Sequence, residues 1–282
     1  MDVLSDAIGT MRVGRPSLTL EDADPWWEKD AGIFDGARFY VGTTGRIEVT
    51  APDEAVVTLR PGDAVLLPHG TAHTLANATD RTARFLSGAY RLERARPHPL
   101  FQDLPDLVSL PARPDRYQGL QASIDLLLGE LGEPMHGRDL VLPALLEVLL
   151  VHLIRACLIE RAGLRATGWC VALDDEVVAR SLRALHERPA DPWTVESLGA
   201  HAGLSRAAFA RRFTAMVGQP PLTYLTWWRL TVAARLLQTT DAPLSTVAQR
   251  TGYGSPYAFA NAFKREYGIS AGRYRQQHRT GR

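Results

Sequence analysis

The chain has 282 residues, of which 45% are hydrophobic and 22% are charged, and its formal net charge is +1. This length suits two domains with separate cores, and the composition excludes disordered and fibrous proteins. Only two cysteines occur, Cys157 and Cys170, which excludes a disulfide framework. The first residues lack the basic start and apolar core of a secretory signal, so we expect a cytoplasmic protein.

Short β-rich runs separated by turns fill residues 38 to 90. Such regular turns favour a small barrel or sandwich. Within this region the sequence has the spacing G-x5-P-x-G-x2-H-x3-N, which resembles the second motif of the cupins, a family of jelly-roll barrels. The motif residues are Gly62, Pro68, Gly70, His73 and Asn77.

A metal-binding cupin also has an H-x-H and a glutamate in its first motif, and the matching residues 39–46 contain neither. One histidine does not hold a metal. We therefore expect no metal and no other cofactor, and we interpret His73 as a hydrogen-bonded histidine inside the barrel rather than a remnant ligand. A small molecule is expected to bind the barrel instead, although the aromatic candidates would equally suit a core. The candidate effector-binding residues are Trp26, Trp27, Tyr40, His69, His73 and Phe85.

Two helices are predicted after the barrel. Leu120, Ile124, Leu127, Leu128 and Leu131 share one face of the first helix, and a longer apolar helix covers residues 140–159. Proline and charged residues interrupt this second helix, which argues against a membrane span. The helices either pack on the barrel or form a dimer interface, and we predict a homodimer. Residues 163–173 show no periodicity and are predicted to be a linker.

Residues 194–218 and 244–268 repeat each other with an offset of fifty. In each copy a short helix ends at a glycine, a serine caps the next helix, and two phenylalanines four residues apart anchor that helix. This order is the sequence form of a helix-turn-helix unit. Two copies of matching type therefore predict two such units.

The face opposite the phenylalanines carries small residues, which allow close approach to DNA, and Arg and Asn, whose donors fit guanine and adenine edges. The region is also basic: from Arg180 onward 15 Lys and Arg face 5 Asp and Glu, a net charge of +10, which leaves −9 for the preceding residues. Any one of these side chains alone would suit a solvated surface, but their joint placement predicts DNA contact, with Arg212 on phosphate. The predicted DNA-binding residues are Arg206, Ala207, Ala210, Arg211, Arg212, Ser255, Pro256, Tyr257, Ala260, Asn261 and Lys264.

Residues 176–277 resemble the DNA-binding domain of AraC/XylS transcription regulators, in which a long helix, here 223–237, joins two helix-turn-helix units. The resemblance rests on the signature Gly252-Tyr253-Gly254-Ser255 followed by Phe259, Phe263, Lys264 and Tyr274. It departs from the family at Gly254, where an acidic residue is frequent, and at Ala271, where proline is frequent. Residues 2–6 and the Trp26-Trp27 pair resemble the cupin-bearing subgroup. The resemblance implies promoter DNA and RNA polymerase as partners.

The sequence thus predicts an α+β protein: a cupin-like regulatory barrel at 1–115, a helical dimerisation and linker region at 116–175, and a double helix-turn-helix DNA-binding domain at 176–282. The expected function is sequence-specific transcription regulation controlled by a small molecule, without catalytic residues. A metal-independent cupin enzyme fused to a DNA-binding domain and a nonspecific nucleic-acid-binding protein are the alternatives. The promoter, the effector and the choice between activation and repression are left open.

Overall fold

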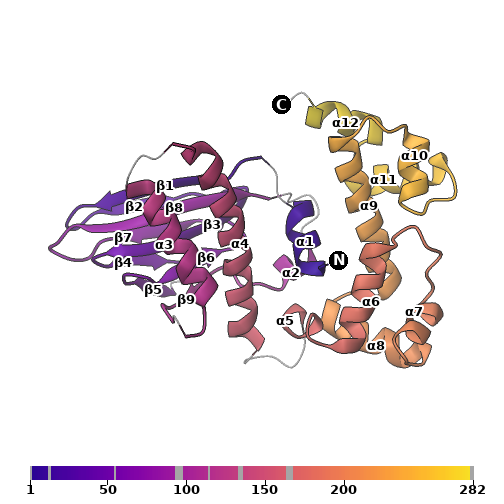
Figure 1. Cartoon of the computed structure of the whole chain (residues 1–282), viewed down its shortest axis with the longest axis horizontal. Coiled ribbons are helices and arrows are strands. Elements are labelled where there is room, and N and C mark those ends of the chain that lie inside the picture. Colours follow the sequence, from indigo (N-terminus) through magenta and orange to yellow (C-terminus); the bar gives the residue numbers. More distant parts are fainter. Residues whose placement is uncertain are drawn as a thin grey trace. The chain divides into compact units, whose positions relative to one another are not determined.

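The computed structural model describes residues 2–11, 14–53, 55–92, 98–113, 115–132, 136–162 and 168–279. It divides into two compact units (Figure 1). The barrel unit is Met11–Leu164, and the helical unit joins Met1–Thr10 to Arg165–Arg282. The sequence predicts that the first ten residues belong to the barrel domain, whereas the structure groups them with the C-terminal part.

Two antiparallel sheets form the barrel unit, in the orders β1-β8-β3-β6-β9 and β2-β7-β4-β5 (Figure 1). The predicted barrel is confirmed. The strands are β1 (Ser17–Ala23), β2 (Glu28–Ala31), β3 (Gly36–Thr44), β4 (Ile47–Thr50), β5 (Val56–Leu59), β6 (Ala64–Leu67), β7 (His73–Ala76), β8 (Ala83–Arg91) and β9 (Val108–Leu110).

The alternation of side chains along β3 separates the barrel interior from its outer face. Tyr40 lies in the core between the sheets, where Val49 and Leu75 are also buried. The preceding residue, Phe39, points to the other face and stacks on Tyr90 with ring centroids 5.5 Å apart. The hydroxyl of Tyr90 donates a 2.7 Å hydrogen bond to the carbonyl of Leu146, so a helix covers this outer face.

The covering helices are α3 (Gln118–Gly132) and α4 (Arg138–Ala162), which follow the short α2 (Pro99–Gln102). On the predicted face of α3, Leu120, Ile124 and Leu127 are buried within the barrel unit, and Leu128 and Leu131 are half-buried. The structure therefore favours packing over a dimer interface for this face. By length and composition alone α4 would also suit a membrane span, but it packs against α3 and its Leu149 and Leu153 are fully buried.

The helical unit begins with α1 (Val3–Met11), whose Leu4, Ala7 and Ile8 are buried. Within the predicted linker the structure describes a short helix, α5 (Trp169–Ala172), and the Trp169 indole donates to the carbonyl of Val217, 3.3 Å away. This segment lacks periodicity in the sequence, and in the structure one buried tryptophan anchors its short helix. The remaining helices are α6 (Glu176–Glu187), α7 (Val195–His201), α8 (Arg206–Val217), α9 (Pro221–Thr239), α10 (Leu244–Arg250), α11 (Pro256–Tyr267) and α12 (Ala271–Arg279).

Candidate nucleic-acid interface and barrel cavity

The first helix-turn-helix unit consists of α7 and α8. Thr194 and Ser197 form a reciprocal capping box at the start of α7, and Gly203 has the positive φ of 73° that its turn requires. Phe209 and Phe213 on α8 are fully buried, with ring centroids 5.6 Å apart. Their burial fixes the rotation of α8, so that its opposite face is directed to solvent.

The second unit repeats this design with α10 and α11. Ser255 caps α11 by accepting a 3.1 Å hydrogen bond from the backbone N–H of Ala258, and Phe259 and Phe263 are fully buried. Gly252 has a φ of 77°, and a Cβ atom there would lie 2.8 Å from a guanidinium nitrogen of Arg229. Only glycine therefore fits this turn without a shift of its neighbours.

The predicted connecting helix is confirmed as α9, which runs from the first helix-turn-helix unit to the second. Near its start Tyr224 is buried, with its ring centroid 5.9 Å from that of Phe213. Towards its end Leu230, Ala233 and Leu237 belong to the same core cluster as Phe259 and Phe263. One continuous helix thus contributes to both cores and fixes α8 and α11 relative to each other.

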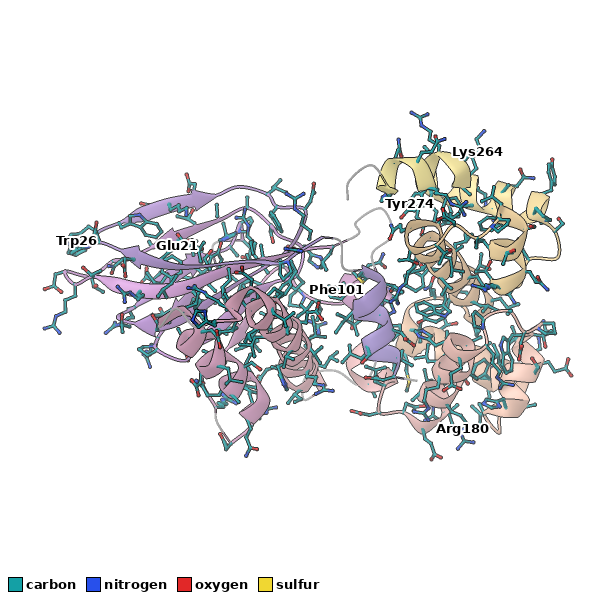
Figure 2. All side chains as sticks on the ribbon, turned by 45° about the horizontal axis from the view of Figure 1, so that its top comes forward. Glu21, Trp26, Phe101, Arg180, Lys264 and Tyr274 are labelled. Atoms are coloured by element: carbon teal, nitrogen blue, oxygen red, sulfur yellow. The ribbon has the colours of Figure 1, made fainter. Side chains whose placement is uncertain are left out.

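The predicted DNA-binding residues all lie on the outer face of α8 or on the start and outer face of α11. Ala210 and Ala260 are half-buried and the others are exposed, Tyr257 by 77%. Figure 2 shows Lys264 projecting outward from α11. The structure therefore brings the predicted residues together as two exposed helix faces, each of them partly basic.

Arg212 differs from its neighbours because it already has a partner. Its Nε and Nη2 atoms donate to the same carboxylate oxygen of Asp175, at 3.1 and 2.5 Å. The other oxygen of Asp175 accepts from the N–H of Val178 and so caps α6. Burial raises the pKa of Asp175, but the bonds from Arg212 and Val178 outweigh it, and the net effect is a lowered pKa. Arg212 therefore ties α8 to the start of α6, a role that the sequence does not reveal.

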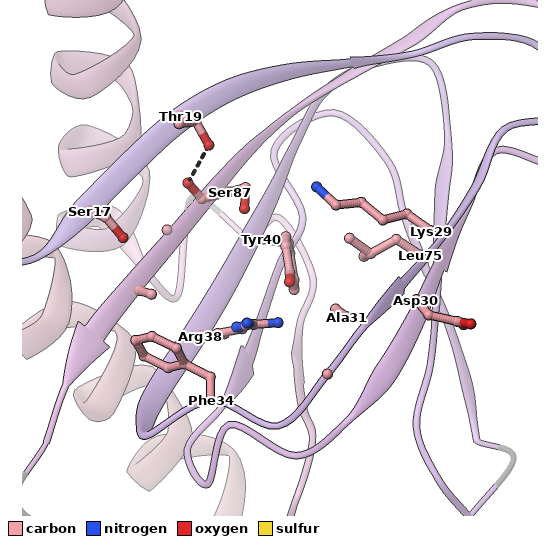
Figure 3. A pocket seen from close by; sticks show the side chains of 13 residues that line it. Ser17, Thr19, Lys29, Asp30, Ala31, Phe34, Arg38, Tyr40, Leu75 and Ser87 are labelled. Atoms are coloured by element: carbon pink, nitrogen blue, oxygen red, sulfur yellow. Dashed lines mark hydrogen bonds between the residues drawn. The ribbon is translucent and has the colours of Figure 1, made fainter.

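The barrel unit contains a cavity of about 320 Å³ between its two sheets (Figure 3). Tyr40 is the predicted effector-binding residue that lines it. Polar side chains that sequence reasoning missed surround Tyr40, notably Arg38, Lys29 and Ser87. Arg38 and Tyr40 are two apart on β3, and Ser87 faces Tyr40 on β8, so strand register brings them to one place.

The other aromatic candidates have different environments. Phe85 is fully buried in the barrel core and Trp27 packs against that core, with ring centroids 6.0 Å apart. Trp26 is 72% exposed and lies at a loop end of the barrel unit (Figure 2). The structure thus places Trp27 and Phe85 as neighbours in the core and Trp26 apart from them.

Both histidine candidates form hydrogen bonds to the protein. His73 Nδ1 donates to the carbonyl of Thr71, 2.7 Å away, and Nε2 accepts from the Tyr40 hydroxyl at 2.8 Å. Burial lowers the pKa of His73, which keeps the ring neutral and suits these roles. His69 Nε2 lies 2.9 Å from the carbonyl of Leu104. A metal does not fit here: both nitrogens of His73 are engaged, and the described residues contain no group of three or more metal-ligating side chains.

The motif residue Asn77 also has a structural role. Its buried amide nitrogen donates to the carbonyls of Ala23, Asp24 and Arg81 at 2.8 to 3.0 Å. Its side-chain oxygen accepts from Thr79. The cupin-like spacing therefore marks the residues that shape the turns of this barrel.

Comparison with known proteins agrees with this arrangement. Residues 2–159 match the cupin family, and residues 198–277 match the helix-turn-helix domain family. A putative AraC-like transcription regulator of Streptomyces antibioticus is 35% identical over 98% of this chain and 99% of its own. The RCS-specific HTH-type transcriptional activator RclR of Escherichia coli is 31% identical over 88% and 87% of the two chains.

Among solved structures, the DNA-binding domain of AdpA in complex with a target DNA is 37% identical to the matched part. That match covers 38% of this chain and 96% of the other, with a TM-score of 0.36. The near full-length matches to the curated regulators establish the relationship. The chain belongs to the AraC family of DNA-binding transcription regulators and carries a cupin domain in its N-terminal part.

Proposed function

We propose that this regulator reads an asymmetric promoter site with α8 and α11 in successive major grooves, and that a small molecule in the barrel cavity controls it. The observation that carries the DNA-reading proposal is the pair of exposed faces on helices whose phenylalanines are fully buried. Two recognition helices joined by one rigid helix suit grooves about 34 Å apart on one face of the duplex. A single chain is then expected to protect two zones about ten base pairs apart.

Arg211 is the residue we assign to base reading in the first zone. Its side chain is exposed on α8, and among the described residues no carboxylate forms an ion pair with it. A free guanidinium can bond guanine O6 and N7 together. In the second zone Asn261 is exposed on α11 and has the amide geometry for adenine.

Genomic footprinting of the full chain would first identify the target site. Arg211→Ala is then expected to weaken binding to that site by about 1–3 kcal/mol at fixed salt, and binding to random DNA far less. Arg180→Ala is the matched control, because Arg180 is an exposed arginine of the helical unit that pairs with Glu176 on α6. Equal losses on both DNAs for Arg211→Ala would contradict the assignment, and a single short protected zone would contradict the two-groove geometry.

The barrel is proposed to bind its ligand without catalysing a reaction on it. The relatives are named as transcription regulators. Around the cavity, His73 is held neutral between Tyr40 and Thr71, and burial raises the pKa of Tyr40. These groups support binding and positioning better than acid–base catalysis.

We further propose a cytoplasmic homodimer that acts with RNA polymerase. Among the large apolar side chains that stay exposed, those on α4 are Leu140 by 80%, Val141 by 37%, Val148 by 46% and Ile159 by 42%. Val141, Val148 and Ile159 follow one another after about two and about three helical turns, so they form a stripe along α4 with Leu140 beside it. Leu140→Glu combined with Val148→Glu is expected to give monomers in sedimentation, whereas Val56→Glu on the exposed part of β5 is not. If the double variant stays dimeric, the interface lies on another surface. If the wild type is monomeric, the proposed homodimer is contradicted.

A further inference from the structure

The cavity between the sheets has one cationic side chain without a counter-ion. Arg38 projects from β3 into the cavity, half-buried (Figure 3). Among the described residues no carboxylate forms an ion pair with it. A guanidinium stays protonated at every physiological pH, so its charge persists at this half-buried position.

The other charged groups around the cavity are already paired or turned away. Lys29 lies 3.0 Å from the carboxylate of Glu21, so these two charges offset each other. Asp30 accepts from the hydroxyl of Thr74, and in Figure 3 its carboxylate points away from Arg38. Among the described residues that line the cavity, Arg38 is therefore the cation that no carboxylate pairs with.

The orientation of Arg38 is fixed before any ligand arrives. Its guanidinium carbon lies 5.1 Å from the ring centroid of Phe34, a cation–π contact. On its other side is Tyr40, whose hydroxyl is held by His73. A planar donor fixed in this way suits two parallel hydrogen bonds to a carboxylate.

The remaining walls set the size and character of the ligand. Phe34, Ala31, Leu75 and Ala89 provide apolar surface, and Ser87 lies beside them. The volume of about 320 Å³ is at the lower end of the range of about 300–1,000 Å³ for small-molecule pockets. A phosphate monoester carries about −1.5 to −2 charges at neutral pH, which is more than one guanidinium balances.

We propose that the cavity binds a small monocarboxylate, whose carboxylate pairs with Arg38 and whose apolar part lies against Phe34 and Leu75. This inference rests on the proposed role of the cavity as the effector site and names the class of that effector. It also accounts for a half-buried arginine that the barrel itself leaves uncompensated.

Titration calorimetry of the full chain tests the proposal with benzoate and hexanoate as probes, each compared with its neutral amide. Both carboxylates are expected to bind, and the amides about tenfold to a hundredfold more weakly, because the hydrogen bonds to the charged guanidinium are lost. Arg38→Gln is expected to weaken carboxylate binding by the same factor without changing amide binding. Arg46→Gln, at an exposed turn of the same unit, is the control.

Equal binding of acids and amides, unchanged carboxylate binding by Arg38→Gln, or no binding of either carboxylate at millimolar concentration would each overturn the proposal. The acid–amide comparison needs no variant, so it holds even if Arg38→Gln does not fold. Footprinting with each probe separates this inference from the proposed effector control. If a carboxylate binds without changing the footprint, the carboxylate site is supported and the proposed regulation by the cavity ligand is contradicted. If only an amide changes the footprint, the regulation is supported and the carboxylate site is contradicted.

Discussion

The carboxylate of Asp6 lies 3.2 Å from Nδ1 of His186, although 180 residues separate them in the chain. The His186 side chain is fully buried, its ring stacks on Trp228 at a centroid distance of 3.8 Å, and Nε2 accepts from the hydroxyl of Tyr224 at 2.7 Å. Every polar atom of this imidazole is therefore engaged. The contact ties α1 to the inside of the helical unit rather than to its surface.

Asp6→Ala is expected to destabilise the protein by about 1–3 kcal/mol, because it leaves a buried imidazole nitrogen without a partner. Thermal or urea unfolding of the full chain, followed by a probe of the helical unit, measures this. Ser5→Ala changes an exposed residue of the same helix and is expected to have little effect. Equal small effects of both variants would show that Asp6 does not hold α1 in place.

The same histidine predicts a pH dependence of stability. Burial lowers the pKa of His186, and the Asp6 carboxylate only partly opposes it, so the folded pKa lies below the ordinary value of 6.5. As the pH falls below about 6.5, the unfolded chain binds a proton that the folded chain resists, and the free energy of unfolding decreases until the folded pKa is reached.

We therefore expect the wild type to unfold more easily at pH 5.5 than at pH 7.5, and His186→Gln to reduce this difference. Buried histidines in the barrel unit, such as His73, contribute to the slope as well, so the change in slope is the quantity that matters. His201→Gln alters an exposed histidine and serves as the control. An unchanged slope for His186→Gln would show that His186 is not the titrating group.

Cys157 is predicted to be inert in the folded protein. It is fully buried on α4, and burial raises the pKa of its thiol to about 12, so almost no reactive thiolate forms at neutral pH. Iodoacetamide at pH 8 is expected to leave Cys157 unmodified in the native chain and to modify it after unfolding, as peptide mapping by mass spectrometry would show. Rapid native modification would instead indicate frequent opening of this helix.

Two glycine substitutions are expected to have opposite effects. Gly70 has a φ of 55°, and a Cβ atom there would lie 2.3 Å from the carbonyl oxygen of Phe34, so Gly70→Ala should destabilise the barrel by about 1–3 kcal/mol or more. Gly129 lies in α3 with no atom near its would-be Cβ, and Gly129→Ala should stabilise by about 0.5–1 kcal/mol. Denaturant midpoints of the two variants distinguish these outcomes. A neutral Gly70→Ala would mean that the turn adapts.

Local patterns in the sequence were sufficient for the helix-turn-helix units. The fifty-residue repeat, the glycine turns and the serine caps act within a few residues of one another, and α7, α8, α10 and α11 form where they predict. The short strands of the barrel were predictable for the same reason, because turn residues separate them in the sequence.

Contacts between distant segments were not predictable in this way. Arg38 and Ser87 meet only once β3 and β8 pair, and neither belongs to a recognisable motif. The docking of α1 depends on a pair of residues 180 positions apart. Sequence reasoning selected aromatic residues for the cavity by type, and type alone does not distinguish the buried Phe85 from the exposed Trp26.

We expect Arg212 to link the stability of the helical unit to its affinity for DNA. Because its guanidinium is bound to the Asp175 carboxylate, Arg212→Ala is expected to remove both this link and one positive charge from the outer face of α8. If Arg212 also meets a phosphate, the variant should weaken specific and random DNA alike. The slope of log K against log salt should then decrease in magnitude by about 0.9.

Asp175→Asn separates the two roles of Arg212, since it removes the paired charge and keeps the arginine. This variant should lose stability, because the ion pair with Arg212 is broken, but it should bind DNA at least as tightly as the wild type, because a guanidinium and one net positive charge are freed. Salt-dependent titrations of both variants on both DNAs, together with their unfolding midpoints, give the comparison. If Asp175→Asn weakens DNA binding as much as Arg212→Ala does, then Arg212 acts by positioning α8 and not by contacting phosphate.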